Sequence, residues 1–329
     1  MRIVERKQPC AACEAEQAVY VKPLVEKDGA GNGHIVRCPK CALVSVDPMP
    51  PLEANDLQDV YDEAYYSEYG GFQCIGNPVA DRIMLAACDR QLAMFEQYVD
   101  KGIMLDFGCA DGKFLKAAQL RGWDAYGLDI SSYAVDCAKA AGLKAFCGII
   151  DDLPIEDGSV NLVIMSHVIE HIGDSTDVLR DIRRKLKEGG LLVVETENSR
   201  SLRRAIELAV IWIASQLVKP LGTRFRTRGK QRYHRLHPPV HVHTYGRKSL
   251  EALLSRVGFE VVHVTCPGMG NPCFCVTVPG KRKSLFENVL QRVDSLGGHL
   301  GIGEVIVVLA RAIEQPSSAV LDKGHSSDA

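Results

Sequence analysis

After residue 100 the chain alternates between short apolar runs and longer amphipathic segments. The runs Ile103 to Phe107 and Val160 to Met165 have the length of buried strands, whereas Lys113 to Arg121 and Val178 to Leu186 have helical spacing. Strands that alternate with helices predict an α/β fold with a doubly wound sheet. By the same criteria we expect a strand within 186–198, helices at 202–217 and 283–296, and terminal strands within 261–278 and 303–313.

The first hundred residues are organised differently. The prolines of VDPMPP (46–51) mark a boundary, so residues 1–50 are expected to form a small unit of their own. A helical extension is predicted over 51–100, where a longer helical pattern at 80–99 follows a tyrosine-rich stretch (Tyr61, Tyr65, Tyr66, Tyr69). The α/β domain would then occupy 101–313 and a polar, disordered tail 314–329.

Four cysteines in the first unit fall into two CxxC pairs, Cys10 with Cys13 and Cys38 with Cys41. Four thiolates can close a tetrahedron around one zinc ion, and the intervening segment suits a small β-ribbon. Residues 28–33 between the pairs are rich in turn-forming residues, as a hairpin requires. Because the protein would fill every ligand position, this zinc would be structural. The alternative is four buried thiols without a metal.

The most informative stretch is 102–131, in which a strand leads into the turn Gly108 to Gly112, a helix follows, and a second strand ends at Asp129. Small residues let the backbone approach a ligand, and the free N–H groups of the helix N-terminus face it. A dinucleotide site would read GxGxxG. Here Asp106 and Asp111 flank the turn. Their negative charge repels phosphate and favours a cationic amine or sulfonium.

This stretch resembles the first motif of the class I S-adenosylmethionine-dependent methyltransferases, typically (V/I)LDxGCGxGxF. LDFGCADGKF matches it except that Ala110 replaces the middle glycine. Residues 149–172 are similar to the family passage DLPFxDGSFDxVxxxxVxEH, with Asn161 where Asp is usual. The resemblance covers about 100–312 and implies a Rossmann-like sheet of seven strands with an antiparallel last hairpin. The alternative is another Rossmann-like fold that binds a different nucleotide.

The resemblance also implies where S-adenosylmethionine binds. Asp129 is expected to grip the ribose and Asp151 to lie near the adenine amino group. The whole set of expected cofactor residues is Asp106, Gly108, Cys109, Ala110, Asp111, Gly112, Asp129, Ile130, Asp151, Ser166 and His167.

Residues 167–171, HVIEH, match the HxxEH pattern of an inverted zinc-protease motif. That motif needs a long helix, whereas only a short turn separates Met165 from Gly173. The methyltransferase family often has Glu-His here, so His171 is a candidate catalytic residue beside the methyl-transfer pocket. Similar ubiquinone-type and small-RNA enzymes bind a divalent ion through ExxEH. This chain has His167 in place of the first glutamate, a set that suits Mg²⁺ less, and we expect no catalytic metal.

The segment 199–246 is expected to be the insert or lid that selects the acceptor. Its part 219–237 is rich in lysine and arginine without an acidic residue, which suits an anionic, lipid-linked or nucleotide-linked acceptor, or simply forms a solvated loop. Residues 237–264 resemble the family stretch PxHxxxFSxxSLxxLLxxxGFxV, with His241 on the motif histidine and Tyr245 on the aromatic. His241 would either accept a hydroxyl proton or brace the loop.

Composition narrows the class of protein. Hydrophobic residues make up 46% and charged residues 24% of the chain, as in soluble globular proteins. A formal net charge of −2 excludes a generally basic nucleic-acid binder. The N-terminus has no signal-peptide core, and the apolar run 205–218 is too short to span a bilayer, which favours the cytoplasm. Peripheral membrane contact through 202–217 remains compatible with this.

We therefore expect a methyltransferase with an N-terminal zinc ribbon. The ribbon, the YxxxYY stretch and the PxH motif together resemble bacterial enzymes that methylate sugars and other small or glycan-linked acceptors, and such an acceptor is expected to react at a hydroxyl. An RNA methyltransferase is the first alternative; the overall charge and the lack of an aromatic-rich basic face count against it. A cofactor-binding protein without catalysis is the second, and the intact Asp106, Gly108, Gly112 and Asp129 count against it.

Overall fold

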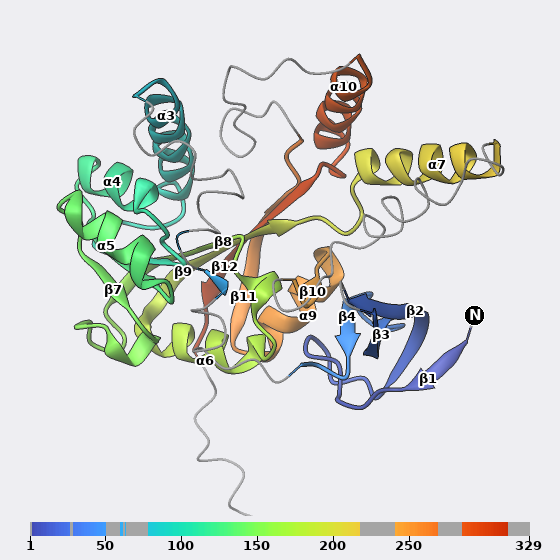
Figure 1. Cartoon of the computed structure of the whole chain (residues 1–329). Helices are drawn as coiled ribbons and strands as arrows, with labels where there is room; N and C mark the ends of the chain where they lie inside the picture. The colour runs from blue at the N-terminus through green and yellow to red at the C-terminus, as the bar shows by residue number, and fades with distance from the viewer. Residues whose placement is uncertain are drawn as a thin grey trace, which may run out of the picture.

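The computed structural model describes residues 2–26, 29–50, 60–61, 63, 78–217, 241–268 and 285–314. Most of the tyrosine-rich stretch, the basic segment 219–237 and residues 315–329 of the expected tail lie outside the described residues. The described chain forms two sheets, one of seven strands and one of five. Figure 1 shows helices on both sides of the larger sheet and the smaller sheet beside α9.

The seven-stranded sheet has the order β11-β12-β9-β8-β5-β6-β7. Neighbouring strands are parallel except at β12, which is antiparallel to both β9 and β11. The strands are β5 (Ile103–Phe107), β6 (Asp124–Asp129), β7 (Ala145–Cys147), β8 (Val160–Ser166), β9 (Leu186–Glu197), β11 (Phe259–Thr265) and β12 (Val305–Ala312). This arrangement confirms the predicted doubly wound, Rossmann-like sheet with an antiparallel last hairpin.

Seven α-helices are described, with two short 3₁₀ turns. They are α3 (Pro78–Phe95), α4 (Lys113–Leu120), α5 (Ser132–Ala140), η1 (Ile150–Asp152), η2 (Ile169–His171), α6 (Ser175–Lys185), α7 (Leu202–Leu217), α9 (Arg247–Arg256) and α10 (Leu285–His299). The α6 helix starts earlier than the apolar periodicity predicted because the Asp174 side chain caps it by accepting a hydrogen bond from Thr176 N. None of the described helices is long and apolar enough to cross a membrane.

Both faces of the large sheet are buried, and successive residues of a strand serve opposite cores. In β5, Met104 packs with residues of α3, α4 and α5, whereas Leu105 packs with residues of α6 and α9. In β8, Leu162 and Ile164 belong to the first core. Asn161, the residue that departs from the family pattern, holds the start of this strand: its Oδ1 accepts from Ile103 N at 3.2 Å and its Nδ2 donates to the Asp100 carbonyl.

The smaller sheet is antiparallel and has the order β1-β2-β3-β4-β10. Its first four strands come from the N-terminal unit: β1 (Ile3–Glu5), β2 (Gln17–Glu26), β3 (Gly29–Arg37) and β4 (Val44–Asp47). The fifth, β10 (His243–Thr244), comes from the segment that follows the insert. The N-terminal unit therefore completes its sheet with a strand that lies about two hundred residues away in the chain.

Candidate functional site

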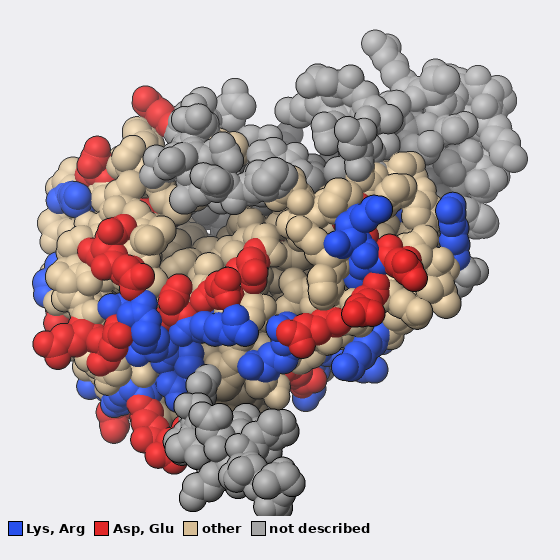
Figure 2. Space-filling view, turned by 90° about the horizontal axis from the view of Figure 1, so that it is seen from below, with Lys and Arg blue, Asp and Glu red and all other residues tan. Residues whose placement is uncertain are grey.

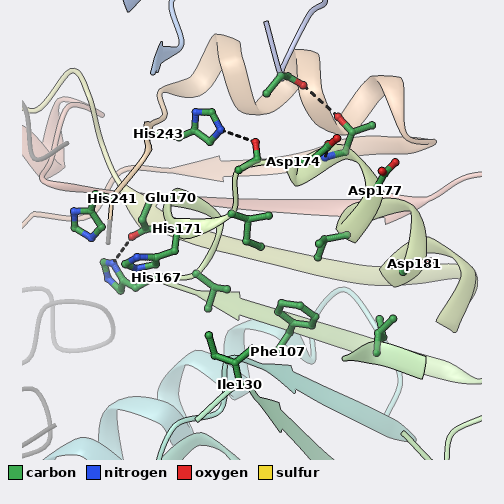
Figure 3. Close-up of a pocket in the computed structure, with 18 of the residues that line it drawn as sticks. Phe107, Ile130, His167, Glu170, His171, Asp174, Asp177, Asp181, His241 and His243 are labelled. Atoms are coloured by element: carbon green, nitrogen blue, oxygen red, sulfur yellow. Dashed lines mark hydrogen bonds and ion pairs between the residues drawn. The ribbon is translucent and has the colours of Figure 1, made fainter. Parts of the chain in front are cut away.

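A cavity of about 1730 Å³, lined by residues that the structure describes, lies between the carboxyl ends of the parallel strands and the N-terminal ribbon. Its wall includes residues of the glycine turn after β5, of the η2 turn and of β10, and Cys10 of the first cysteine pair. Figure 3 shows Phe107 and Ile130 on one side, the cluster of His167, Glu170, His171 and His241 on another, and Asp174, Asp177 and Asp181 along α6. Ligands of doubly wound sheets bind at this edge.

The turn Gly108 to Gly112 folds over the end of β6. The backbone N–H groups of Gly108 and Cys109 both donate to the Leu128 carbonyl, at 2.8 and 3.1 Å. Gly108 has a φ of 85°, and a Cβ there would lie 2.3 Å from a methyl carbon of Val168, so only glycine fits. Ala110, which stands in place of the family's middle glycine, adopts the same left-handed region with a φ of 49°.

Two carboxylates, the buried Asp106 and the partly buried Asp129, define the charge of this turn. Burial and the neighbouring charges of Asp129 and Asp111 raise the pKa of Asp106 to about 7. Burial also raises the pKa of Asp129, although its carboxylate accepts hydrogen bonds from Ala110 N at 2.8 Å and Ser131 N at 2.9 Å. Asp111 is paired with Lys113. A cationic ligand in the cavity would relieve the repulsion between these carboxylates, whereas a phosphate would increase it.

The other expected cofactor residues lie in or next to the cavity wall. Cys109, Ile130, Asp151, Ser166 and His167 all line the cavity, and Gly112 caps the N-terminus of α4 just behind the turn. Asp151 differs from the rest because its side chain is 62% exposed and is paired with Arg184. Its contact with an adenine amino group therefore stays a prediction, and the neighbouring Ile149 and Ile150 supply apolar surface there.

A histidine and carboxylate cluster occupies the other side of the cavity. Glu170 is only 3% exposed; its Oε1 is 3.3 Å from His167 Nδ1 and its Oε2 accepts from Thr196 Oγ1 at 2.8 Å. Burial acts to raise the pKa of Glu170, but the hydrogen bond and charge of His167 and the charge of His171 outweigh it, and the pKa lies at about 2. The carboxylate is therefore ionised.

His171 and His241 lie side by side next to this carboxylate, with ring centroids 4.6 Å apart. The Tyr61 hydroxyl is 2.9 Å from His171 Nδ1 and fixes the orientation of that ring. Ligand atoms of Glu170, His171 and His241 all lie within 4.8 Å of one another, a donor set that can hold one divalent ion or pass a proton. The two candidate catalytic histidines are thus brought together, although 69 intervening residues separate them in the chain.

The sequence interpretation missed three residues that complete this cluster. Glu195 in β9 has its carboxylate 3.8 Å from His167 Nε2, and its carbonyl accepts from His167 N, which has a φ of 54°. Thr196 holds Glu170, and His243 lies behind His241. Only the period-two spacing of His241 and His243 could have suggested a strand that carries a second functional histidine.

His243 is buried at 1% exposure, and its Nε2 lies 3.1 Å from the Gly173 carbonyl, as drawn in Figure 3. A carbonyl only accepts, so Nε2 carries the proton; Nδ1 has no hydrogen-bond partner among the described residues. Burial lowers the pKa of His243 to about 4. The motif aromatic Tyr245 is fully buried beside it, with its hydroxyl 2.8 Å from Ser175 Oγ.

This pKa predicts acid sensitivity. Between about pH 6.5 and pH 4, His243 is protonated in the unfolded state but stays neutral in the folded state. The free energy of unfolding therefore falls as the pH is lowered through this window, by about 3 kcal/mol at most. Urea unfolding at pH 7, 6 and 5 measures the slope. His243→Gln keeps an N–H donor for Gly173 and is expected to show a shallower slope; equal slopes in both proteins would contradict the prediction.

The four cysteines of the N-terminal unit come together as expected. The Sγ atoms of Cys10 and Cys41 are 3.6 Å apart, and those of Cys13 and Cys38 are 3.5 Å apart. Four sulfurs at about 2.3 Å from one tetrahedral zinc ion lie about 3.8 Å from one another, so the geometry fits a zinc ion. The residues that follow the two pairs, Glu14 and Ala42, adopt left-handed φ angles of 59° and 65° and close the two knuckles alike.

Comparisons with known proteins agree with this geometry. A family model described as "Methyltransferase domain" matches residues 81–264, which is more than half of the chain. The ubiquinone biosynthesis O-methyltransferase of Xanthomonas oryzae pv. oryzae is 31% identical over 130 residues, or 36% of this chain and 53% of that protein. The norajmaline N-methyltransferase of Rauvolfia serpentina is 32% identical over 113 residues, or 32% of this chain and 39% of that protein.

A solved structure of a SAM-dependent methyltransferase from Archaeoglobus fulgidus is 18% identical, with a TM-score of 0.45, and the match covers 68% of this chain and 92% of that one. An uncharacterized protein of Methanocaldococcus jannaschii is 29% identical over 148 residues, 45% of this chain and 64% of that protein. The matched stretches thus span less than two thirds of each of these curated relatives.

Proposed function

The chain belongs to the methyltransferase domain family, and from that premise we propose that it transfers a methyl group from S-adenosylmethionine to a hydroxyl of a small-molecule, glycan-linked or lipid-linked acceptor. One observation carries the cofactor part of this proposal: the buried carboxylate of Asp106 and the partly buried carboxylate of Asp129 flank a glycine turn that opens into the cavity. Their charge favours the positive sulfonium and ammonium groups of S-adenosylmethionine over the pyrophosphate of a dinucleotide.

The proposed reaction is an in-line displacement. The acceptor oxygen forms a bond to the methyl carbon while the bond from that carbon to sulfur breaks, and the electron pair stays on sulfur, which becomes a neutral thioether. The hydroxyl proton passes to His241, the proposed general base. Ionised Glu170 lies close enough to stabilise the resulting imidazolium, and His171 orients the acceptor beside it. Alignment of the two reactants supplies the rest of the rate enhancement.

A hydroxyl acceptor is supported by the presence of a base that can take its proton, and by an O-methyltransferase among the relatives. The proposal of an anionic acceptor rests on the basic segment 219–237, outside the described residues. Carboxylates predominate in the described wall, where Asp177 is paired with Arg180 and Asp181 with Arg184. For an anionic acceptor, the lysine and arginine residues of the segment 219–237 are the proposed source of opposite charge.

An RNA acceptor is the alternative, and the face shown in Figure 2 gives it little support. On the face shown in Figure 2, acidic and basic side chains are intermingled, without a continuous basic stripe over the residues that are described. RNA binding draws most of its affinity from such a stripe and weakens steeply with salt. A mobility shift with tRNA or rRNA fragments that disappears at moderate salt would favour this alternative over a small acceptor.

Calorimetry with S-adenosylhomocysteine tests the proposal. We expect binding of one molecule per chain and no measurable binding of NAD, because phosphate would lie against Asp106 and Asp129. Transfer from methyl-labelled S-adenosylmethionine to a panel of monosaccharides, nucleotide-linked sugars and catechols would then identify the acceptor class. Binding of NAD without binding of S-adenosylhomocysteine would overturn the assignment, and cofactor binding without transfer to any panel member or RNA would favour a protein without catalysis.

Cofactor binding is further expected to release protons. The pKa of Asp106 lies at about 7 without a ligand, and a cationic ligand would lower it because it stabilises the carboxylate. Affinity for S-adenosylmethionine should therefore rise with pH through about 7 and fall by up to tenfold per unit below it. Binding enthalpies measured in buffers of different ionisation heat would detect the released proton, and Asp106→Asn should abolish both the release and the pH dependence.

A further inference from the structure

We infer that the zinc ribbon is a positioning element of the catalytic cavity: through β4 it holds the main chain on which His241 and Glu170 are placed. The inference rests on the proposed function in that these two residues act in methyl transfer. It assigns to the N-terminal unit a role in the reaction that is distinct from binding either substrate. Its evidence lies in the backbone bonds of β4 and β10, the side chains of β10 and the contacts of the first cysteine knuckle.

The main chain of Val242 is hydrogen-bonded on both sides. Its carbonyl accepts a hydrogen bond from Val46 N in ribbon strand β4, at 3.2 Å, and its N–H donates to the Glu170 carbonyl at 3.0 Å. Val242 is fully buried and directly follows His241. One residue thus connects the ribbon to both the candidate base and the ionised carboxylate. If β4 moved, Val242 would lose the partner of its carbonyl, and His241 would lose its fixed position.

The side chains of β10 also connect the ribbon with the loop that follows η2. His243 pairs directly with Ser45 of β4, and residues that face each other across antiparallel strands project to the same face of the sheet. Ser45 Oγ accepts from Arg6 Nη2 at 2.8 Å, whereas His243 bonds to the Gly173 carbonyl just after η2. The ribbon residues Arg6 and Ser45 therefore support the same strand that is anchored to the loop after Glu170 and His171.

The zinc site lies between two parts of the ribbon, the first cysteine knuckle and strand β4. The first knuckle is docked on the catalytic domain: the Ala11 carbonyl accepts from Thr176 Oγ1 in α6 at 3.3 Å and from Arg256 Nη1 in α9 at 2.8 Å. The second knuckle ends at Cys41, three residues before β4 begins at Val44. A zinc ion bound by both knuckles would tie the docked segment to β4. Leu43, which precedes β4, also packs in the core cluster that contains residues of α6 and α9.

A pair of full-length variants separates positioning from overall folding. Cys41→Ser removes one zinc ligand, with Cys137→Ser, a cysteine of α5 outside the ribbon, as the matched control. Val46→Pro keeps all four cysteines but removes the N–H that reaches Val242, because proline has no amide hydrogen. Zinc content by mass spectrometry should fall from one ion per chain only in Cys41→Ser.

Two measurements report on position without an acceptor. In both test variants, hydrogen exchange of the Val242 amide should become at least tenfold faster, while the Gly108 and Cys109 amides, which bond to Leu128 within the cofactor wall, should change less than twofold. The rate at which diethyl pyrocarbonate modifies His241 should change at least fivefold. Affinity for S-adenosylhomocysteine should stay within about twofold of wild type, because the proposed partners in the glycine turn and Asp129 lie on the opposite wall.

The outcomes decide the inference separately from the proposed function. Unchanged exchange at Val242 in zinc-depleted Cys41→Ser, or in Val46→Pro, would overturn it. A parallel loss of S-adenosylhomocysteine affinity in Val46→Pro would also overturn it, since the effect would then not be confined to the histidine side. If wild-type protein binds no S-adenosylhomocysteine at all, the proposed function fails, whereas the exchange of Val242 still shows whether the ribbon holds this segment.

Discussion

Asp129→Ala is expected to lower the affinity for S-adenosylhomocysteine by about 100-fold or more, because hydrogen bonds to a charged group contribute about 1.5–3 kcal/mol each and two ribose hydroxyls would lose their acceptor. The change also removes the acceptor for Ala110 N and Ser131 N, which holds the glycine turn in place. Calorimetric titration of the purified variant measures the loss, and thermal unfolding shows whether the fold survives.

The same strand offers a matched control. Asp124 begins β6, is half-exposed and pairs with Lys144 on the surface. Asp124→Ala should leave the affinity within about twofold of wild type, because an exposed ion pair contributes at most about 1 kcal/mol to stability and the side chain does not reach the cavity. Asp129→Asn keeps one oxygen acceptor, so its affinity for S-adenosylhomocysteine should lie between those of Asp129→Ala and Asp124→Ala. Wild-type affinity in Asp129→Ala would show that the ribose partner is misplaced.

His241→Gln is expected to lower kcat by about 100-fold or more, the usual contribution of a positioned general base, with little change in S-adenosylhomocysteine affinity. Glutamine keeps a similar size and a hydrogen-bonding group but cannot accept the hydroxyl proton. The measurement is methyl transfer under saturating S-adenosylmethionine to the acceptor that the wild-type protein methylates in the panel.

His263→Gln serves as the control for this variant, since His263 lies in β11 against Tyr98 and does not line the cavity. Its kcat should match the wild type. Two results would argue against His241 as the base: an unchanged kcat in His241→Gln, or a loss that appears only in KM. If activity instead requires added divalent ions after mild chelation that leaves the ribbon zinc in place, the cluster of Glu170, His171 and His241 acts as a metal site.

The sequence by itself determined the strands and helices of the large domain and the residues of the wall that is proposed to face the cofactor. Short apolar runs that alternate with amphipathic segments required a doubly wound sheet, because both faces of each strand must be covered. Asp106, the glycine turn and Asp129 lie within one local strand, helix and strand unit, so their proximity follows from local geometry. The cysteine pairs could also be identified from the sequence, because zinc ligands occur in the chain at a fixed spacing.

Only the tertiary structure decided how the acceptor side is assembled. His241 meets Glu170 and His171 because β10 joins the ribbon sheet, a pairing between residues about two hundred positions apart that no local pattern encodes. Glu195, Thr196 and His243 entered the cluster for the same reason: each belongs to a strand whose neighbours are set by the order of the sheets. Strand pairing over long separations depends on the packing of the whole chain, and this is why the sequence suggested the two candidate catalytic histidines but could not show what holds them together.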